Sequence, residues 1–541
     1  MMKRALSCLL LVMGAVTTVH AARPLALGTL GKWPADVLFV CGVASLDGLA
    51  ADLDALATSA GVAPLGAALR PLLVQTLGLG DVDPASIDGS RPVTMALLDP
   101  KKHALPLVAV VPLRDGSRLL VNGPRGTLPD AAAVKTLAAL GAWTPRTPLA
   151  LEAALATASE SYAAEVAALR ALLRGAMVDE LSDPAARDEA QRAIDATSSM
   201  IEALAGTERL SLALDLAGGG VRLAAAATPR KGTPLAKTTK DLAARKVGNA
   251  GFVPDDAWAA MGWNLPVQTL SDDPDHVAET LLAAFGQALG NDGWSPEDIA
   301  ALHEGVRRLT SAQSGSAIVW AKSSADGPVI VESLSDVKDG RAYVANLVTL
   351  GDLVFRNTMR GLQEKLALPP MSFKELVAFA SSVFAPSLGM AVSVDEGWTR
   401  NGSHILGMTV AVSWDKVPGV DPRARVMAQH FVGSSMQLAL AGEGKWLAAV
   451  LGPGASASAS TLLASAPQRS KQKPADPILA ELATGAGYLI IRPQALLHAL
   501  VGAPPRGPEQ PISARTASDG KRITVTLEVP PSALGILRSL P

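Results

Sequence analysis

The chain of 541 residues has little cysteine, few aromatic residues and little charge. Aromatic residues make up only 4% of a chain that is 49% hydrophobic, so its core must be built mainly from Leu, Val and Ala. Charged residues make up 18%, below the usual quarter, which argues against long acidic or basic tails. The formal net charge of −2 gives no global reason to bind nucleic acid or an anionic membrane surface.

The chain holds 2 cysteines, Cys8 and Cys41. Cys8 lies inside an N-terminal leader, so the mature chain keeps Cys41 alone and forms no internal disulfide. A lone cysteine also excludes zinc sites built from several thiolates. We expect Cys41 to be a small buried residue of a strand, because no basic neighbour in the sequence would lower the pKa of its thiol.

The N-terminus has the pattern of a secretory signal peptide. Lys3 and Arg4 supply the positive region, residues 5–19 the apolar region, and Val19-His20-Ala21 a cleavage site after Ala21. We therefore expect export to the periplasm or the extracellular space. No later run of about twenty apolar residues follows, which predicts no transmembrane anchor in the mature chain.

The sequence lacks the common catalytic motifs, including a phosphate-binding glycine loop, Gly-x-Ser-x-Gly and His-Glu-x-x-His. Ser335-x-x-Lys338 and Ser413-x-x-Lys416 match the Ser-x-x-Lys pattern of penicillin-binding enzymes, but no Lys-Thr-Gly element follows them. The acidic stretch 272–276 is better explained by helix capping than by a calcium loop. No catalytic, cofactor-binding or metal-binding residue is therefore assigned, and the chain leans away from being an enzyme.

Two stretches of the sequence share one pattern. Pro34-Ala35-Asp36 precedes an apolar run at 37–43, and Ser45 then offers a helix cap. Pro254-Asp255-Asp256 likewise precedes an apolar run at 257–265, before a further helix start at Ser295. The recurrence predicts an internal duplication, with one α+β unit in each half.

These two Pro-Asp openings carry a resemblance to a known kind of protein. With Pro34-Ala35-Asp36 and Pro254-Asp255-Asp256, the plan of the chain resembles uncharacterised secreted bacterial proteins that contain a duplicated α+β unit, a domain of unknown function. The resemblance extends in pattern over most of the mature chain, but its motif is short. It implies a fold and an exported location, and it brings no activity.

Hairpin patterns occur at 93–111, at 210–227 and across Ser518-Asp519-Gly520 into 523–529. Mixed with helical pairs, they predict an α+β fold with antiparallel sheets. The first half is expected to include a long helical hairpin across residues 148–206. We divide the chain into a signal peptide at 1–21, a first half at 22–229, a basic linker at 230–250 and a second half at 251–541. Residues 452–477, rich in Ser, Ala and Pro, are expected to be flexible.

Two groups of residues are candidates for partner contacts. Lys237, Lys240, Arg245 and Lys246 could form a patch for an anionic partner, although a solvated linker is the more common explanation of such a run. Trp398 and Arg400 lie in a predicted hairpin loop, where exposed Trp and Arg often anchor a partner. The alternative for Trp398 is that it folds back onto its own sheet.

Export, duplication and the missing catalytic motifs favour a non-catalytic interaction or scaffold protein of the cell envelope. Its partner would be an envelope protein or a small ligand, and not nucleic acid. One alternative is a periplasmic ligand-binding module with a cleft between its halves, since pockets favour domain interfaces. The other is a hydrolase whose site is assembled from distant residues.

Overall fold

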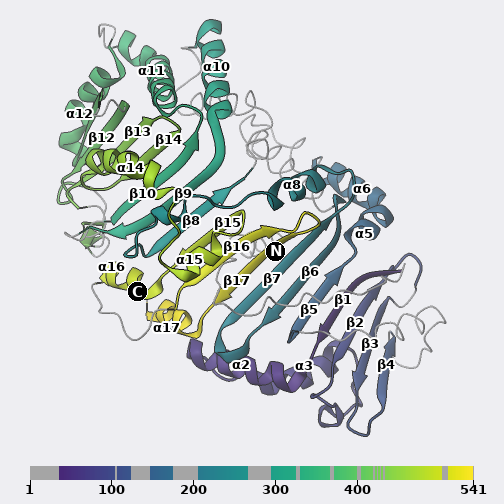
Figure 1. Ribbon diagram of the computed structural model, residues 1–541. Coiled ribbons are helices and arrows are strands. Elements are labelled where there is room, and N and C mark those ends of the chain that lie inside the picture. Colours follow the sequence, from purple (N-terminus) through teal and green to yellow (C-terminus); the bar gives the residue numbers. More distant parts are fainter. Residues whose placement is uncertain are drawn as a thin grey trace. The chain divides into compact units, whose positions relative to one another are not determined.

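A computed structural model describes most of the chain, in two compact units (Figure 1). The described residues are 36–103, 106–122, 147–174, 205–265, 294–324, 329–365, 371–398, 404–417, 421–422, 425–426, 428–429, 433–501 and 510–539. The first unit comprises residues 1–244 and 512–541, and the second comprises residues 245–511. The fold is α+β, as predicted. The last strands belong to the first unit, so the observed division differs from the predicted halves.

The first unit is built on one antiparallel sheet with the described strand order β4-β3-β2-β1-β5-β6-β7-β17-β16. Its strands are β1 (Val37–Val43), β2 (Val93–Leu98), β3 (Leu107–Pro112), β4 (Arg118–Asn122), β5 (Leu149–Ala153), β6 (Thr207–Asp215), β7 (Val221–Pro229), β16 (Ile512–Ser518) and β17 (Ile523–Val529). Its helices are α2 (Leu46–Ala60), α3 (Leu69–Thr76), α5 (Leu155–Ser161), α6 (Ala163–Arg174), α8 (Pro234–Ala243) and α17 (Pro531–Ser539).

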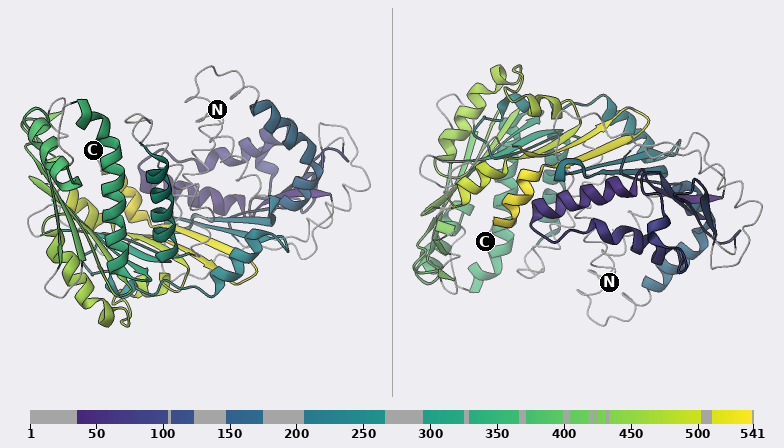
Figure 2. Two further views of the ribbon diagram at one scale, coloured as in Figure 1. Left: turned by 90° about the horizontal axis from the view of Figure 1, so that it is seen from above. Right: turned by 90° about the horizontal axis from the view of Figure 1, so that it is seen from below.

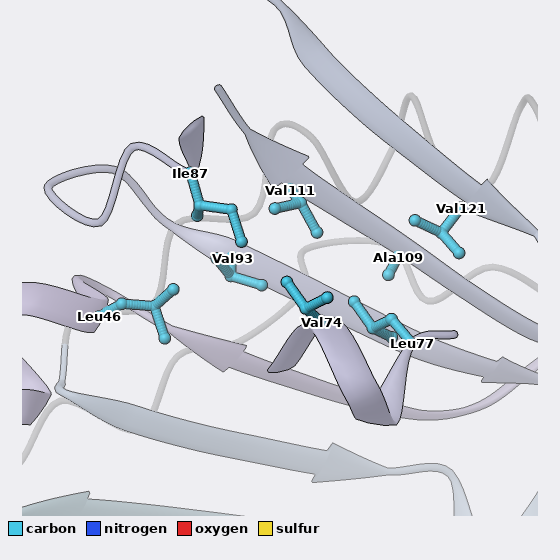
Figure 3. Close-up of a cluster of buried hydrophobic side chains, with 8 residues drawn as sticks. All are labelled: Leu46, Val74, Leu77, Ile87, Val93, Ala109, Val111 and Val121. Carbon is cyan, nitrogen blue, oxygen red and sulfur yellow. The ribbon is translucent and has the colours of Figure 1, made fainter. Parts of the chain in front are cut away.

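Helix α2 begins where the sequence predicts it. The side chain of Ser45 accepts a hydrogen bond from the Gly48 N–H at 2.9 Å, which satisfies one of the free amides of the first turn. Leu46 then enters a cluster that joins α2 and α3 to strands β2, β3 and β4 (Figure 3). The members of this cluster are Leu46, Val74, Leu77, Ile87, Val93, Ala109, Val111 and Val121. This aliphatic core contains no aromatic side chain, as the composition predicts.

The strands of the second unit also pair antiparallel, and their described order is β15-β8-β9-β10-β14-β13-β12-β11. Its strands are β8 (Ala259–Asn264), β9 (Gln313–Ser323), β10 (Val329–Val337), β11 (Met390–Trp398), β12 (His404–Val412), β13 (Ser435–Glu443), β14 (Trp446–Leu451) and β15 (Gly487–Ile491). Its helices are α10 (Pro296–Ala312), α11 (Gly340–Lys365), α12 (Phe373–Leu388), α14 (Ala455–Arg469), α15 (Pro477–Leu482) and α16 (Pro493–Val501).

Helices α14 and α11 lie on opposite faces of the sheet strands of the second unit (Figure 2). The α14 face carries the cross-strand row Gly262, Ile318, Leu334 and Ala448, in which the last three side chains are fully buried. Helix α11 begins at Gly340, directly against Gly442 of β13. A Cβ on Gly442 would stand 1.9 Å from the Gly340 carbonyl oxygen, so only glycine permits this approach.

The prediction of a flexible segment at 452–477 is wrong. Residues Ala455–Arg469 form α14, and α14 packs against β13 and β14. Alanine is the strongest helix former, and its small side chains let the helix lie close to the sheet. The buried stripe repeats at helical spacing, and its members are Ala455, Ala459, Leu462, Leu463 and Ala466. The Ser and Ala content thus supports a packed helix rather than a linker.

Two further expectations in the first unit need correction. Residues 148–206 were expected to be helical throughout, but Leu149–Ala153 form β5, between β1 and β6. Helices α5 and α6 follow, and the rest of the predicted helical hairpin, at 175–204, lies outside the described residues. The linker at 230–250 contains the packed helix α8, in which Thr239 and Leu242 are buried.

Most predicted strands and hairpins are confirmed, including β1, β2–β3, β6–β7 and β16–β17. The Ser295 cap is also confirmed, since its hydroxyl accepts from the Asp298 N–H at 3.1 Å. The predicted signal peptide at 1–21 lies outside the described residues. Across the described segments, no helix combines the length and the apolar character that would let it cross a membrane.

Candidate functional site

A cavity of about 290 Å³ lies within the second unit, between α14 and strands β9 and β10. We call it the α14 pocket. It combines aromatic, charged and hydroxyl side chains, and its lining residues are Phe252, Pro254, Trp320, Lys322, Glu332, Ala457, Ser458, Thr461, Leu462, Ser465 and Arg469. Ala457 and Thr461 are exposed, so the cavity reaches the protein surface.

The floor of the α14 pocket is a cross-strand pair. Trp320 of β9 stands directly opposite Glu332 of β10, and strand alternation turns both side chains toward α14. Both are buried, and the Trp320 Nε1–H donates to Glu332 Oε2 at 2.7 Å. Lys322 Nζ lies 2.8 Å from the same oxygen. The Glu332 charge is therefore compensated within the floor, as a buried carboxylate requires.

The wall of the pocket is formed by the small side chains of α14. Ser458, Thr461 and Ser465 follow one another at helical spacing of three and four residues, so they share one side of the helix. The Thr461 and Ser465 hydroxyls donate back to the helix, to the carbonyls of Ala457 and Leu462. Among the described residues the Ser458 hydroxyl has no hydrogen-bond partner. It is the wall hydroxyl that is free to donate.

Arg469 closes one end of the pocket. It occupies the last turn of α14, where a positive charge suits the helix dipole. Its Nη2 donates to the Phe252 carbonyl at 3.1 Å, and its guanidinium lies 5.5 Å from the centre of the Phe252 ring. A Cβ on Gly251 would stand 2.4 Å from the Gln472 carbonyl oxygen, so glycine allows this segment to approach the end of α14. Arg469 is thereby fixed in position.

Arg469 differs from Lys322 in its charge balance. Lys322 is paired with Glu332, whereas no described carboxylate lies within ion-pair distance of Arg469. The pocket therefore holds two positive charges and one negative charge. This excess positive charge at the end of a cavity can attract an anionic group.

The first unit contains the other prominent polar cluster, which we call the Asp99 network. Its members come from the start of β1, the β2–β3 connection and the α5–α6 region: Asp36, Asp99, Lys101, Lys102, His103, Ser161, Tyr162 and Glu165. Asp99 is 1% exposed. Its carboxylate accepts from the Lys101 N–H at 3.0 Å, from the Tyr162 hydroxyl at 3.2 Å and from the Ser161 hydroxyl at 3.3 Å.

The hydrogen bonds of the Asp99 network keep Asp99, Tyr162 and Glu165 in their ordinary charge states. The Lys101 N–H, helped by Tyr162 and Ser161, lowers the pKa of Asp99 despite the opposing effect of burial. Burial and the bond to Asp99 raise the pKa of Tyr162, so the phenol keeps its proton. Lys101 lies 2.6 Å from Glu165 and lowers the pKa of that carboxyl. A carboxylate that already accepts several hydrogen bonds holds strands and helices together, and it is a poor general base.

A larger cavity of about 410 Å³ lies on the α11 face of the strands of the second unit. We call it the Tyr343 pocket. The cross-strand row Trp263, Ala317, Ser335 and Leu447 forms its floor, and Tyr343 of α11 contributes to its lining. The Tyr343 hydroxyl accepts from Gln313 Nε2 at 3.0 Å. This lining carries fewer charges than that of the α14 pocket.

The described contact residues that the sequence predicts lie on separate elements of the fold. Trp398 is the last residue of β11, opposite His404, rather than a loop residue, and Arg400 lies outside the described residues. Lys237 and Lys240 are exposed on α8 in the first unit.

The other two members of the predicted basic patch belong to the second unit. Arg245 donates to the Asn264 side chain and to the Leu265 carbonyl, both at 3.1 Å, which assigns it a structural role. Lys246 is exposed. Cys41 is half-buried in β1, where burial raises the pKa of its thiol.

Sequence reasoning missed both polar clusters. Asp99, Lys101, Lys102 and His103 stand in one hairpin connection, and this run of charge was a usable signal. For the α14 pocket, the signal was the helical spacing of small residues before Arg469. Within the described segments, no group of three or more His, Cys, Asp or Glu side chains is arranged to hold a metal ion.

Comparisons with known proteins give little further guidance. No family model and no curated protein matches the chain. Crystal form IV of TP0453 is similar over 55% of this chain and 97% of that chain, at 8% identity and a TM-score of 0.20. Crystal form III of TP0453 covers 55% and 98%, at 9% identity and the same TM-score. Likeness at this level carries no argument about fold or function.

Proposed function

We propose that this protein is an exported, non-catalytic binding protein of the cell envelope that holds a small ligand in the α14 pocket. The observation that carries the proposal is Arg469, which is fixed at the end of a cavity and has no described carboxylate partner. A cavity that combines aromatic and aliphatic lining with a few converging polar groups is the usual form of a ligand site. The N-terminal leader pattern supports export, to the periplasm or the extracellular space.

The order of strands supports the proposed duplication. In the first unit β1 pairs with β2, and β2 pairs with β3. In the second unit β8 pairs in the same way with β9, and β9 with β10. Helices separate the first and second strands in each case, namely α2 and α3 in the first unit and α10 in the second. The resemblance to secreted proteins with a duplicated α+β unit is consistent with this order.

The experiment is a thermal-shift screen of the mature protein against small metabolites. Binding to the native state alone raises the melting temperature, and a ligand at about 100 times its Kd adds about 2.7 kcal/mol of stability. Ser458→Leu fills the pocket, whereas Ser456→Leu alters an exposed residue of the same helix that does not line it. Hits should be lost in Ser458→Leu and kept in Ser456→Leu. Hits that survive in both variants would place the ligand elsewhere.

An interaction role is the second candidate, and an exposed apolar surface of the first unit favours it. Val62, Leu65 and Leu72, on and beside the connection between α2 and α3, are each more than half exposed, at 56%, 54% and 55%. Cross-linking in the native envelope followed by mass spectrometry tests this role. Replacing the three residues by Ser should abolish recovery of a specific partner.

The hydrolase alternative has no support from the two polar clusters. The Asp99 and Glu332 carboxylates are both held by hydrogen bonds and by lysine side chains, so neither is free to act as a general base.

A further inference from the structure

We infer that the α14 pocket selects a small monoanionic ligand, a carboxylate with a compact apolar or aromatic body, and that Arg469 binds the carboxylate. The inference rests on the proposed function, since it names the ligand class of the same pocket. It is argued from the charge balance, from the orientation of Arg469 and from the size and lining of the cavity.

The charge balance calls for one negative charge. Lys322 and Glu332 neutralise each other at 2.8 Å, which leaves the Arg469 charge. A cation in a partly buried position interacts more strongly with an incoming anion than a cation in water does. A neutral ligand would leave Arg469 without compensation, and a dianion would introduce an excess negative charge beside Glu332.

The orientation of Arg469 favours a carboxylate. One of its terminal nitrogens is held by the Phe252 carbonyl and its guanidinium carbon lies 5.5 Å from the centre of the Phe252 ring, so the guanidinium is pre-organised. Its remaining N–H groups are available to donate, and a guanidinium pairs with a carboxylate through two parallel hydrogen bonds. The free hydroxyl of Ser458 offers a further donor in the wall of the pocket.

The cavity limits the rest of the ligand. A volume of about 290 Å³ is at the lower end of the range for drug-sized ligands, so the ligand is small. Trp320, Phe252 and Leu462 supply aromatic and aliphatic lining, which suits a compact apolar body. These side chains are buried in the protein core, so this part of the pocket is pre-formed.

The experiment compares acids with their uncharged amides of nearly the same shape. Benzoate and phenylacetate, each beside its amide, are titrated at millimolar concentration into the mature protein and followed by saturation-transfer NMR. We expect each acid to bind at least about tenfold more tightly than its amide, which corresponds to about 1.4 kcal/mol. Arg469→Gln should abolish the difference, and Arg469→Lys should keep part of it. Circular dichroism verifies that the variants fold.

Arg356→Gln is the matched control. Arg356 is an exposed arginine on α11, paired with Asp352, and it does not line the α14 pocket. It should keep the full preference for the acids. Equal binding of acid and amide to the wild type would overturn the inference but keep the proposed function. If neither acid nor amide binds, the inference fails, and the metabolite screen decides the proposed function separately. A preference for the acids that survives Arg469→Gln would overturn the role of Arg469.

Discussion

The Asp99 network and the α14 pocket both place charged groups in protected positions, but they balance those charges differently. Each charged side chain named in the Asp99 network has an opposite charge near it, with Lys102 shared by Asp36 and Asp99. In the α14 pocket Lys322 and Glu332 are paired, and Arg469 has no described carboxylate. A cluster in which every charge is paired stabilises the fold. A positive charge without a paired carboxylate beside a cavity can instead bind an anionic ligand.

The largest expected fall in stability comes from a substitution in the Asp99 network. Asp99→Ala removes the carboxylate that accepts three hydrogen bonds, so the Tyr162 and Ser161 hydroxyls lose their acceptor. We expect it to cause the greatest fall in melting temperature among the substitutions considered. Asp115→Ala is the control, because Asp115 accepts similar bonds from Ser117 in an exposed turn. Circular dichroism melting curves measure both. Equal small effects would show that the network is not structural.

The next effect concerns the floor of the α14 pocket. Glu332→Ala leaves the Lys322 ammonium and the Trp320 N–H without their acceptor, which should cost about 2–3 kcal/mol. Glu332→Gln keeps an acceptor for Trp320 and should cost less. Hydrogen exchange of the β9 and β10 amides is the measurement, since it reports on this region separately from the first unit. Unchanged protection in Glu332→Ala would contradict the paired-charge description.

The contributions of Asp99 and Asp336 to the stability of the fold should change in opposite directions as the pH falls. The pKa of Asp99 is lowered by its hydrogen bonds, so its contribution to stability is present above the unfolded value near about 3.9 and is lost as pH falls through the folded pKa. The pKa of Asp336 is raised by burial, despite the nearby Lys445, so its contribution is present below about 3.9 and is lost as pH rises through the folded pKa.

Two asparagine variants test this difference in sign. Asp99→Asn should destabilise the first unit more at pH 7 than at pH 3. Asp336→Asn should be harmless or stabilising at pH 7, because it removes the cost of burying a charge. Melting curves at the two pH values give the comparison. The same pH trend in both variants would contradict it.

The smallest effect is expected at the exposed lysines of α8. Replacing Lys237 and Lys240 by Glu should change the free energy of unfolding by less than about 0.5 kcal/mol, because both side chains are solvated. It should also leave binding to the α14 pocket unchanged. The double variant therefore serves as a charge-altered reference for cross-linking in the envelope. Loss of a specific partner would assign that partner to this part of the predicted basic patch.

The sequence predicts local structure better than it predicts these sites. Alternation and turn residues predict β16 and β17, and the caps at Ser45 and Ser295 occur as expected, because each depends on neighbouring residues. The strand β5 was missed, because its apolar run Leu149–Ala153 also suits a helix until its pairing with β1 is known.

The sites depend on contacts between residues that are distant in the sequence. Arg469 meets Phe252 across 217 positions, and Tyr162 meets Asp99 across 63. No local sequence pattern predicts a contact between residues so far apart in the chain. The sequence does show the residue types that take part in the two sites. They are a run of charged residues after β2 and a helix of small residues that ends in an arginine.

The pairing of β7 with β17 affects the order in which the chain can fold. The first unit is interrupted, because its last strands and helix lie at 512–541, after the whole of the second unit. The second unit is continuous from 245 to 511, so it can fold as soon as its own residues have been synthesised. The edge of β7 stays unpaired until the residues of β17 have been synthesised. During that interval the unpaired strand edge can pair with other chains and aggregate, so a chaperone would be most needed then.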